Sequence, residues 1–572
     1  MEFVDCVDEA FTQSMFSKNS TQNSMAMTTL HKIIVDATDV IGPLPAIWRS
    51  FGYDEINWTY TPRGRRVFDE MAKLSKNPYY IRCHNTFTAG NGLSTPTKGS
   101  CNVCRINNAG KVEYDFTLLD QVIQTFLENN CKPIIELGFM PDALSKGPRP
   151  KATYDYRGTD LWKYPPRDFH RWQELVYETV KHYVEKYDAE EVRKWYWEVW
   201  NEPDTPGFFT GSLKDYLKLY DFAVAGATKA LTNIRIGGPA LAHQPKFLDK
   251  FLQHCIAGKN FASGERGSRL DFISLHAKGS GWPLPGQPFQ MPSLRKIMGQ
   301  LESYRDVIVK YPQLRRTEIL LDECDMAVGT NFGMYDFPEY EFHNSEYYPA
   351  FVVRMAKHLL DFIRDHEPPI RLFTTWAFYY EGKRFFEGNR ALFDNENIKK
   401  PIFNAFQLFE MLGETRLSLQ SIPAAGRVSE LLPIDGIATC DSAGNLAICI
   451  WNFGENLRQT GSQLVDLEVR WGSNSDIPLN SPFDKLRAGA SKGDLVERFQ
   501  IDGERSNSYS LWKTFGSPQD PSPEQIAQMR KSADLQIVEP QTAVAISEGK
   551  SHYRFELPMP SVALIRTQRA IS

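Results

Sequence analysis

The sequence predicts an α/β protein built on a closed (β/α)8 barrel, followed by a smaller β-sandwich domain. Over residues 31–415, eight short apolar runs alternate with segments of helical periodicity. After about residue 416 the helical spacing gives way to short alternating strands separated by turns. No glycine-rich phosphate turn follows the first predicted strand, which disfavours the alternative of a doubly wound open sheet.

The barrel prediction is built from apolar runs of strand length with helices between them. The predicted strands are 44–48, 79–83, 132–138, 195–201, 233–238, 271–276, 318–323 and 371–378. The clearest helical periods are 117–130, 168–187, 213–231, 294–311 and 347–366. Parallel strands in such an order need a helical crossover between each pair, and the spacing allows one.

The remaining segments complete the domain prediction. Residues 1–30 are polar and are expected to form a disordered tail, and residues 416–572 are expected to form the sandwich. Within the sandwich the predicted strands include 445–453, 464–471 and 554–565, and 481–496 is predicted to be an exposed insertion. The strand 32–38 precedes the barrel and could join this second domain instead.

The composition is that of an ordinary soluble globular protein, with a formal net charge of −5. This mild negative charge argues against nucleic acid or an anionic membrane as partner, and no apolar run approaches the roughly 18–20 residues that span a bilayer. The N-terminus lacks a basic and apolar leader pattern, so we expect a cytoplasmic protein. Nine cysteines suggest reduced thiols, and Cys101 with Cys104 is predicted to be a loop thiol pair without zinc.

Acidic residues stand at the ends of two predicted barrel strands, where such barrels carry their active sites. The stretch "WYWEVWNEPD" (195–204) places Glu202 at the end of the fourth strand, and Asp322 and Glu323 end the seventh. Two carboxylates so placed can flank one glycosidic bond, one protonating the leaving oxygen and the other attacking the anomeric carbon. Spacing alone does not choose the nucleophile between Asp322 and Glu323.

Side-chain alternation along these strands predicts which residues face the barrel axis. Glu198 shares a face with Glu202, one layer deeper, and as a buried acid it needs a partner. Arg82 on the second strand is the candidate partner, and Glu136 on the third competes for it. On the fourth strand, alternation predicts that residues 196, 198, 200 and 202 share one face. On the seventh strand, it predicts Glu323 on the face of Ile319 and Leu321, with Asp322 on the opposite face.

Several further residues converge on the same barrel end. His84 and Asn85 end the second strand, His276 the sixth and Trp376 the eighth. Each alone is better explained by core packing, but jointly they favour a substrate site. A metal mechanism is not predicted, because no His-Glu-x-x-His helix or tight His/Asp cluster occurs. Walker A and Gly-x-Ser-x-Gly motifs are absent as well.

The motifs "WEVWNEPD", "IRCHNTF", "DFISLHAKG", "ILLDECD" and "NIKKPIFNAFQLFEMLG" together resemble glycoside hydrolase family 39, the family of β-xylosidases and α-L-iduronidases. The resemblance covers roughly residues 31–570. It implies a barrel with an accessory sandwich, a retaining exo-glycosidase without a cofactor, and a small oligosaccharide or glycoside as substrate. It also suggests a homo-oligomer. It implies these roles: Glu202 as acid/base, Glu323 as nucleophile, Asn201 on the sugar 2-hydroxyl, Arg82 bracing the nucleophile, and His84, His276, Trp376 and Glu381 lining the −1 subsite.

One position departs from the pattern of the β-xylosidases that this chain resembles, which have His-Ala-Tyr at the sixth strand. Here the triplet is His276-Ala277-Lys278, and Lys278 could meet a hydroxyl cluster or a carboxylate on the substrate. The predicted substrate is a β-D-xyloside from xylo-oligosaccharides. An α-L-arabinofuranoside or a substituted arabinoside is the alternative, and a carbohydrate-binding protein without catalysis is a remote third, disfavoured by the intact Glu202 and Glu323.

Overall fold

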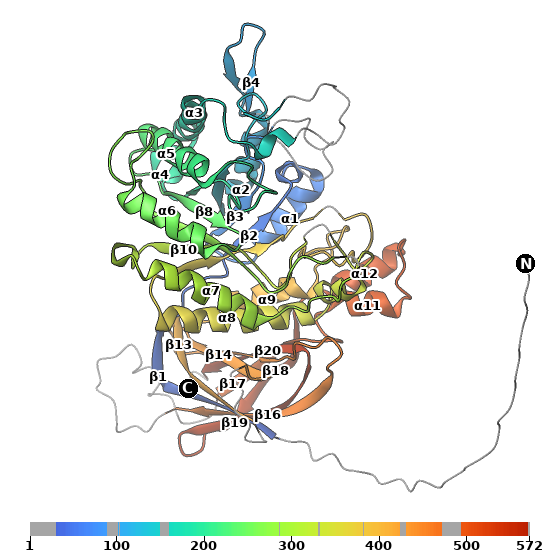
Figure 1. Cartoon of the computed structure of the whole chain (residues 1–572). Helices are drawn as coiled ribbons and strands as arrows, with labels where there is room; N and C mark the ends of the chain where they lie inside the picture. The colour runs from blue at the N-terminus through green and yellow to red at the C-terminus, as the bar shows by residue number, and fades with distance from the viewer. Residues whose placement is uncertain are drawn as a thin grey trace, which may run out of the picture.

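The computed structural model of the chain describes residues 30–88, 101, 103–148, 160–284, 286–329, 332–380, 382–423, 431–471 and 494–569. It shows a strand-and-helix barrel stacked on a second, all-β layer, as Figure 1 shows from the side. Apart from Leu30, the predicted tail lies outside these residues, as does most of the predicted insertion.

A parallel sheet forms the barrel, and its strands follow one another in chain order. The strands are β2 (Ser50–Tyr53), β3 (Tyr79–Cys83), β6 (Cys131–Leu137), β7 (Tyr196–Val199), β8 (Ile236–Leu241), β9 (Phe272–Lys278), β10 (Glu318–Asp325), β11 (Ile370–Phe373) and β12 (Thr375–Trp376). The last two are halves of one segment: β11 pairs with β10 and β12 pairs with β2, which closes the sheet. The predicted barrel is therefore confirmed.

The first predicted strand, 44–48, is wrong. Ile47 and Trp48 are fully buried, as the apolar run suggested, but Pro45 interrupts the segment and it forms turns. The ladder begins only at Ser50, where β2 pairs with β3. Apolarity predicts burial but does not separate a buried turn from a strand.

Helices pack around the barrel after each strand. They are α1 (Pro62–Ala72), α2 (Thr117–Glu128), α3 (Phe169–Tyr187) with the short α4 (Ala189–Val192), α5 (Leu213–Ala230), α6 (Pro245–Ala257), α7 (Leu294–Ile308), α8 (Tyr347–Asp365) and α9 (Pro401–Glu410). Short 3-10 helices occupy Ile56–Trp58, Asp160–Lys163, Pro312–Leu314 and Pro338–His343, and a hairpin joins β4 (Cys104–Ile106) to β5 (Val112–Tyr114). Local sequence fixes the helix starts, as at Ser212, whose side chain and Asp215 form a capping box on α5.

The interior of the barrel is apolar at one end and charged at the other. The apolar layer contains Ile134, Tyr196, Phe272, Leu320 and Leu372, one from each of five strands. Two residues further along, three of these strands carry buried acids: Glu136 on β6, Glu198 on β7 and Asp322 on β10. The barrel thus presents ionisable groups at the C-terminal ends of its strands, where barrel enzymes hold their sites.

A second nine-stranded sheet lies below the barrel in Figure 1. In spatial order it contains β18 (Gln536–Val544), β17 (Asp494–Ile501), β20 (Ser561–Arg569), β15 (Leu446–Asn452), β14 (Ile434–Cys440), β13 (Thr415–Ile422), β1 (Leu30–Pro43), β16 (Gly461–Arg470) and β19 (Lys550–Met559). All neighbours are antiparallel except β1 and β16. Strand β1, which precedes the barrel in the chain, therefore belongs to this sheet.

This sheet folds over on itself as a sandwich does. Leu467 and Leu557 from one end and Ile450 and Ile565 from the middle belong to one apolar cluster, together with Val35 of β1. Distant strands of a flat sheet could not share a core in this way. The predicted segment 554–565 corresponds to parts of two strands, β19 and β20, since a turn at Pro560 separates them.

Helix α8 lies between the barrel and the sandwich and contacts both (Figure 1). Tyr347 Oη donates to the carbonyl of Glu455 at 2.9 Å, and Lys357 Nζ lies 2.8 Å from Asp435 Oδ2. These bonds join α8 to the loop after β15 and to strand β14 of the second sheet. The two layers are thus fixed relative to each other through α8.

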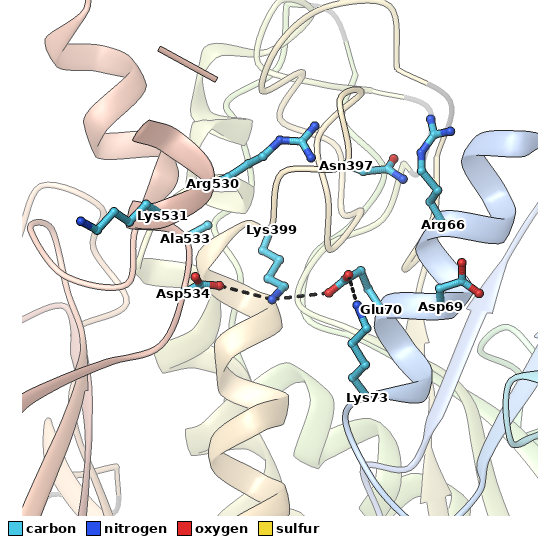
Figure 2. A pocket seen from close by; sticks show the side chains of 10 residues that line it. All are labelled: Arg66, Asp69, Glu70, Lys73, Asn397, Lys399, Arg530, Lys531, Ala533 and Asp534. Carbon is cyan, nitrogen blue, oxygen red and sulfur yellow. Dashed lines mark hydrogen bonds and ion pairs between the residues drawn. The ribbon is translucent and has the colours of Figure 1, made fainter. Parts of the chain in front are cut away.

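Two helices near the C-terminus, α11 (Ser508–Thr514) and α12 (Pro523–Ser532), pack back against the barrel. Trp512 and Met529 share an apolar cluster with Phe386 of a barrel loop. A cleft lies between α12, α1 and the segment before α9 (Figure 2). Its volume is about 400 Å³, and within it Lys399 Nζ lies 3.5 Å from Glu70 and 3.4 Å from Asp534. The residues that line this cleft include none of the predicted site residues.

None of the helices in the described ranges combines the length and the apolar composition that crossing a bilayer requires.

The sandwich core predicts a stability effect for β1. Ile33 is fully buried and pairs with both β13 and β16, so Ile33→Ala should cost about 2–5 kcal/mol through lost burial and the cavity left behind. Urea denaturation followed by fluorescence measures the shift. Ile422→Ala on the paired strand β13 is the control, since Ile422 is 44% exposed; equal shifts for both variants would contradict the assignment of β1 to a core.

Candidate active site

Arg82 on β3 is the centre of the charged layer, and it is completely buried. Its Nε donates to Glu198 Oε2 at 2.6 Å and lies 3.4 Å from Asp322 Oδ2. Its other nitrogens lie 3.2 Å from Glu136 Oε2 and 3.2 Å from Glu323 Oε1. A buried charge without partners would be prohibitively costly, so the single guanidinium and the four carboxylates depend on one another. Arg82 therefore contacts both Glu198, its predicted partner, and Glu136, the predicted competitor.

Four acids around one arginine cannot all be ionised at low cost. Burial raises the pKa of Glu198 well above its usual range, and the nearby acids Asp322 and Glu136 add to this against the opposing charge of Arg82. For Asp322, burial alone would raise the pKa, but Arg82 and His276 bring it below its usual value. We conclude that Glu198 holds a proton and that Asp322 is ionised.

A register shift on β10 brings two neighbouring acids to the same side. Leu320 pairs with Ser274 and Glu323 pairs with His276, so β10 has one residue more than β9 over this stretch. Asp322 and Glu323 therefore both contact Arg82. The alternation-based prediction, with these two acids on opposite faces, is wrong for this reason.

The regular side-chain alternation of the fourth strand ends before Glu202. β7 ends at Val199, and Trp200 and Glu202 have φ values of 71° and 43°. Such left-handed conformations cost about 1–3 kcal/mol each in residues other than glycine and persist where surrounding structure fixes them. Trp200 consequently packs outward against Phe139 and Trp172, and the prediction that 196, 198, 200 and 202 share one face is wrong at Trp200.

Backbone hydrogen bonds hold Glu202 in this conformation. Its amide donates to the carbonyl of Ala240 at 2.9 Å. Two residues on, the carboxylate of Asp204 accepts from the amides of residues 242–244 at 3.0–3.1 Å. These bonds join the turn after β7 to the turn after β8 and so fix the backbone position from which the Glu202 side chain extends.

His276 on β9 lies between the two acids that the sequence singled out. Its Nδ1 is 2.9 Å from Glu202 Oε1, and its Nε2 is 3.7 Å from Glu323 Oε1. One atom from each of the three side chains can be chosen so that all lie within 4.8 Å of one another. Burial alone would lower the pKa of His276, but Glu323 and Asp322 raise it to about 10. His276 is therefore an imidazolium that donates to Glu202.

Lys278 bonds directly to Glu323. Its Nζ donates to Glu323 Oε2 and to Asp325 Oδ2, each at 2.6 Å. Arg390 approaches the same Asp325 oxygen at 2.5 Å. Burial alone would raise the pKa of Glu323, but His276, Lys278 and Arg82 hold it well below its usual range. Glu323 is therefore a carboxylate at neutral pH.

The remaining predicted residues on the same barrel end surround this pair of acids. His84 Nδ1 bonds to Glu136 Oε2 at 2.5 Å, and its ring lies 4.5 Å from that of Trp376. Asn201 Oδ1 accepts from Arg82 at 2.8 Å, while its buried Nδ2 has no hydrogen-bond partner within the described part of the chain. Asn201 thus offers a free donor beside the acids.

Of the remaining predicted residues, Asn85 lies apart from this group and Glu381 is not described. Asn85 is buried beside the loop after β2, where its side-chain amide donates to the carbonyl of Asp54 at 3.1 Å; among the described residues it bonds to neither Glu202 nor Glu323. Glu381 lies outside the described residues.

The triad Glu202, His276 and Glu323 has the spacing of a three-ligand metal site, but its charge does not suit a metal ion. A metal would need His276 neutral, whereas the surrounding carboxylates keep it protonated. Arg82 and Lys278 add positive charge at the same place. The triad therefore suits proton transfer and carboxylate chemistry better than metal binding.

Two residues of the group were missed from the sequence. Asp325 lies two residues after Glu323 on β10, so alternation along the strand could have found it. Its Oδ1 accepts from the backbone amide of Trp376 at 2.7 Å, which fixes the end of the eighth strand. Arg390 comes from an irregular segment, "EGNRALF", and no periodic pattern points to it.

Comparison with protein-family models matches residues 31–549 to the glycosyl hydrolases family 39. The chain belongs to glycoside hydrolase family 39. It is 25% identical over 499 residues to the β-xylosidase of Geobacillus stearothermophilus, covering 84% of this chain and 86% of the relative. It is 26% identical over 566 residues to the α-L-iduronidase of Mus musculus, covering 93% and 80%.

Solved structures share the fold over nearly the whole chain. A bacterial orthologue of human α-L-iduronidase superposes with a TM-score of 0.73 at 21% identity, covering 96% of this chain and 85% of that one. A monomeric β-xylosidase from Caulobacter crescentus superposes with a TM-score of 0.71, also at 21% identity, covering 94% and 100%. As a family 39 member the chain is a glycosidase, and the resemblance read from its motifs is confirmed.

The ion pair of Lys278 with Glu323 predicts a change in pH dependence. Glu323 has a lowered pKa, so it stays ionised as pH falls, and removing a cation must raise that pKa. In Lys278→Met the acidic limb of kcat/KM should therefore move to higher pH, as measured on an activated glycoside.

The control for this experiment is Lys310→Met, which removes an exposed lysine of the barrel surface. An acidic limb that stays in place in Lys278→Met, or that moves equally in the control, would contradict the electrostatic role of Lys278.

Proposed function

We propose that the chain is a retaining exo-glycosidase that works by double displacement, with Glu323 as nucleophile and Glu202 as acid/base. The observation that carries the proposal is the approach of these two carboxyl groups to His276, with one oxygen of each within 4.8 Å of the other. Retaining enzymes hold their two carboxyl groups about 5–5.5 Å apart, whereas inverting enzymes leave about 6.5–9.5 Å for a water molecule.

The surroundings of the two acids differ in a way that supports these roles. Glu323 has an 8% exposed side chain and ion pairs to Arg82 and Lys278, so it is ionised and positioned to attack. Glu202 has a 17% exposed side chain and bonds to His276. The more accessible acid is the one that must exchange protons with a leaving group and then with water.

The reaction is divided between these groups in two steps. Glu202 gives its proton to the leaving oxygen while Glu323 forms a glycosyl ester, which removes the negative charge of Glu323. In the second step, Glu202, now without its proton, takes a proton from a water molecule as that water attacks the anomeric carbon, which breaks the ester and releases the Glu323 carboxylate. The free Nδ2 of Asn201 is placed to donate to the sugar 2-hydroxyl.

Nucleophile and acid/base variants should behave differently. Glu323→Ala should lose nearly all activity, about 10⁴-fold or more, and azide should restore turnover of an activated glycoside with inverted product. Glu202→Ala should keep the first step on substrates with good leaving groups, because these need no proton. Chromatography and NMR of the products give both readouts.

An exposed acid, Glu265, provides the matched control: Glu265→Ala should keep wild-type rates. Azide rescue in the Glu202 variant that gives inverted product, together with a residual first step in the Glu323 variant, would reverse the assigned roles.

For the substrate, we propose a terminal β-D-xyloside of xylo-oligosaccharides. The support is the similarity of the chain to β-xylosidases at 25–27% identity. An α-L-arabinofuranoside would fit the same pair of acids. In either case the neutral sugar would have to accommodate Lys278 through its hydroxyl groups.

A terminal uronide is a second candidate, and one observation favours it. Lys278 and Arg390 place two cations around Asp325, next to Glu323. Cations at this position suit a sugar carboxylate, because charge-assisted bonds from lysine and arginine to carboxylates are strong and geometrically specific. Relatives that align over 93–94% of this chain are α-L-iduronidases.

A panel of aryl glycosides decides between these substrates. We expect turnover of the β-D-xyloside, with little change in its KM when Arg390 is replaced by Met. If an α-L-iduronide or a β-D-glucuronide is hydrolysed at least about tenfold faster, and Arg390→Met removes that preference, the uronide replaces the xyloside. Absence of turnover on all of these, including the arabinofuranoside, would contradict the proposed reaction.

A further inference from the structure

Trp282 is a large aromatic side chain that stays 53% exposed on the loop after β9. The other tryptophans in the described ranges are buried or half-buried. Its ring meets Phe332 edge-on, with centroids 5.7 Å apart and planes at 68°, so Phe332 supports the ring from one side. A tryptophan held in this way presents apolar surface that the fold itself does not use.

The loop that carries Trp282 is well anchored. At its base, the amide of Ser293 donates to the carbonyl of Gly279 at 3.0 Å. Gly281 donates to Gln290 Oε1 at 2.9 Å, and Phe289 packs edge-on against Tyr340 at 5.1 Å. The loop is thereby fixed to the segment that follows β10.

Chain connectivity places Trp282 close to the catalytic group. It follows Lys278, which bonds to Glu323, by four residues. A chain of four residues spans at most about 14 Å, and both ends of this segment lie on the C-terminal side of the barrel. The backbone of Trp282 therefore lies no more than about 14 Å from that of Lys278, a distance that the sugars next to the scissile bond can bridge.

We propose that Trp282 forms the stacking platform of an aglycone subsite, which binds the pyranose ring of the leaving sugar or of its neighbour. The apolar C–H face of a pyranose is complementary to an aromatic face, and the polar edge of the sugar stays in water. This inference rests on the proposed function, since it assumes that the departing group is a sugar.

Neighbouring exposed side chains are less suited to this role. Leu284 is 56% exposed on the same loop but has no ring. Tyr335, after β10, is 40% exposed, but the guanidinium of Arg384 covers its face at 3.9 Å. Trp282 combines a ring, exposure and a fixed support.

Equilibrium binding tests the subsite without turnover. Xylose and xylotriose are titrated calorimetrically into Glu323→Ala and into the double variant Glu323→Ala/Trp282→Ala. We expect xylotriose to bind more tightly than xylose in the first protein, and the added Trp282→Ala to weaken xylotriose about three- to tenfold with no change for xylose. Trp282→Phe in the same background should restore most of the affinity.

Leu284→Ala in the Glu323→Ala background is the matched control and should leave both affinities unchanged. Equal affinity for xylose and xylotriose, failure to bind either sugar, or an equal loss in the control would overturn the proposal. Because no turnover is involved, failure of the proposed reaction appears separately, as absence of activity in the wild-type panel. A Trp282→Ala loss with unchanged circular dichroism excludes a folding defect as the cause.

Discussion

The buried guanidinium of Arg82 is the constraint on which the catalytic end of the barrel depends. Four acidic side chains from three strands surround it, and its positive charge offsets much of the cost of burying them together. The strands that carry them must therefore keep their relative register. The same contacts leave Glu198 protonated beneath the site and Glu323 ionised within it, so one cation fixes both the geometry and the protonation pattern.

A second arrangement of charge lies at the outer edge of this group. Asp325 joins Lys278, Arg390 and the backbone of Trp376, which come from β9, an irregular loop and the eighth strand. Lys278 in turn bonds to Glu323. The nucleophile proposed here is thus held from below by Arg82 and from the side by Lys278. This lateral cation is where the chain departs from the tyrosine of the xylosidase pattern.

The sequence was informative wherever a regular pattern reached a residue. Strand and helix periodicity predicted the barrel. Side-chain alternation predicted that Glu198 points inward and needs a buried partner, which is Arg82. Prediction failed where the backbone departs from regularity. The extra residue on β10 turned both Asp322 and Glu323 toward Arg82, and the positive φ of Trp200 broke the alternation of β7. Arg390 lies in a segment without any period, so only tertiary structure brings it to the site.

These departures share a physical cause. A regular strand can aim only alternate side chains into a barrel, at one level each. Bringing Asp322, Glu323 and Asp325 together with His276 and Glu202 requires more ionisable groups in one volume than regular strands supply. The extra residue on β10 and the left-handed residues after β7 bring these groups together. The conformational cost is offset by the hydrogen bonds that the Ala240 carbonyl and the Asp204 carboxylate accept from backbone amides. The positions that sequence patterns could not place are therefore those at which the fold concentrates charge.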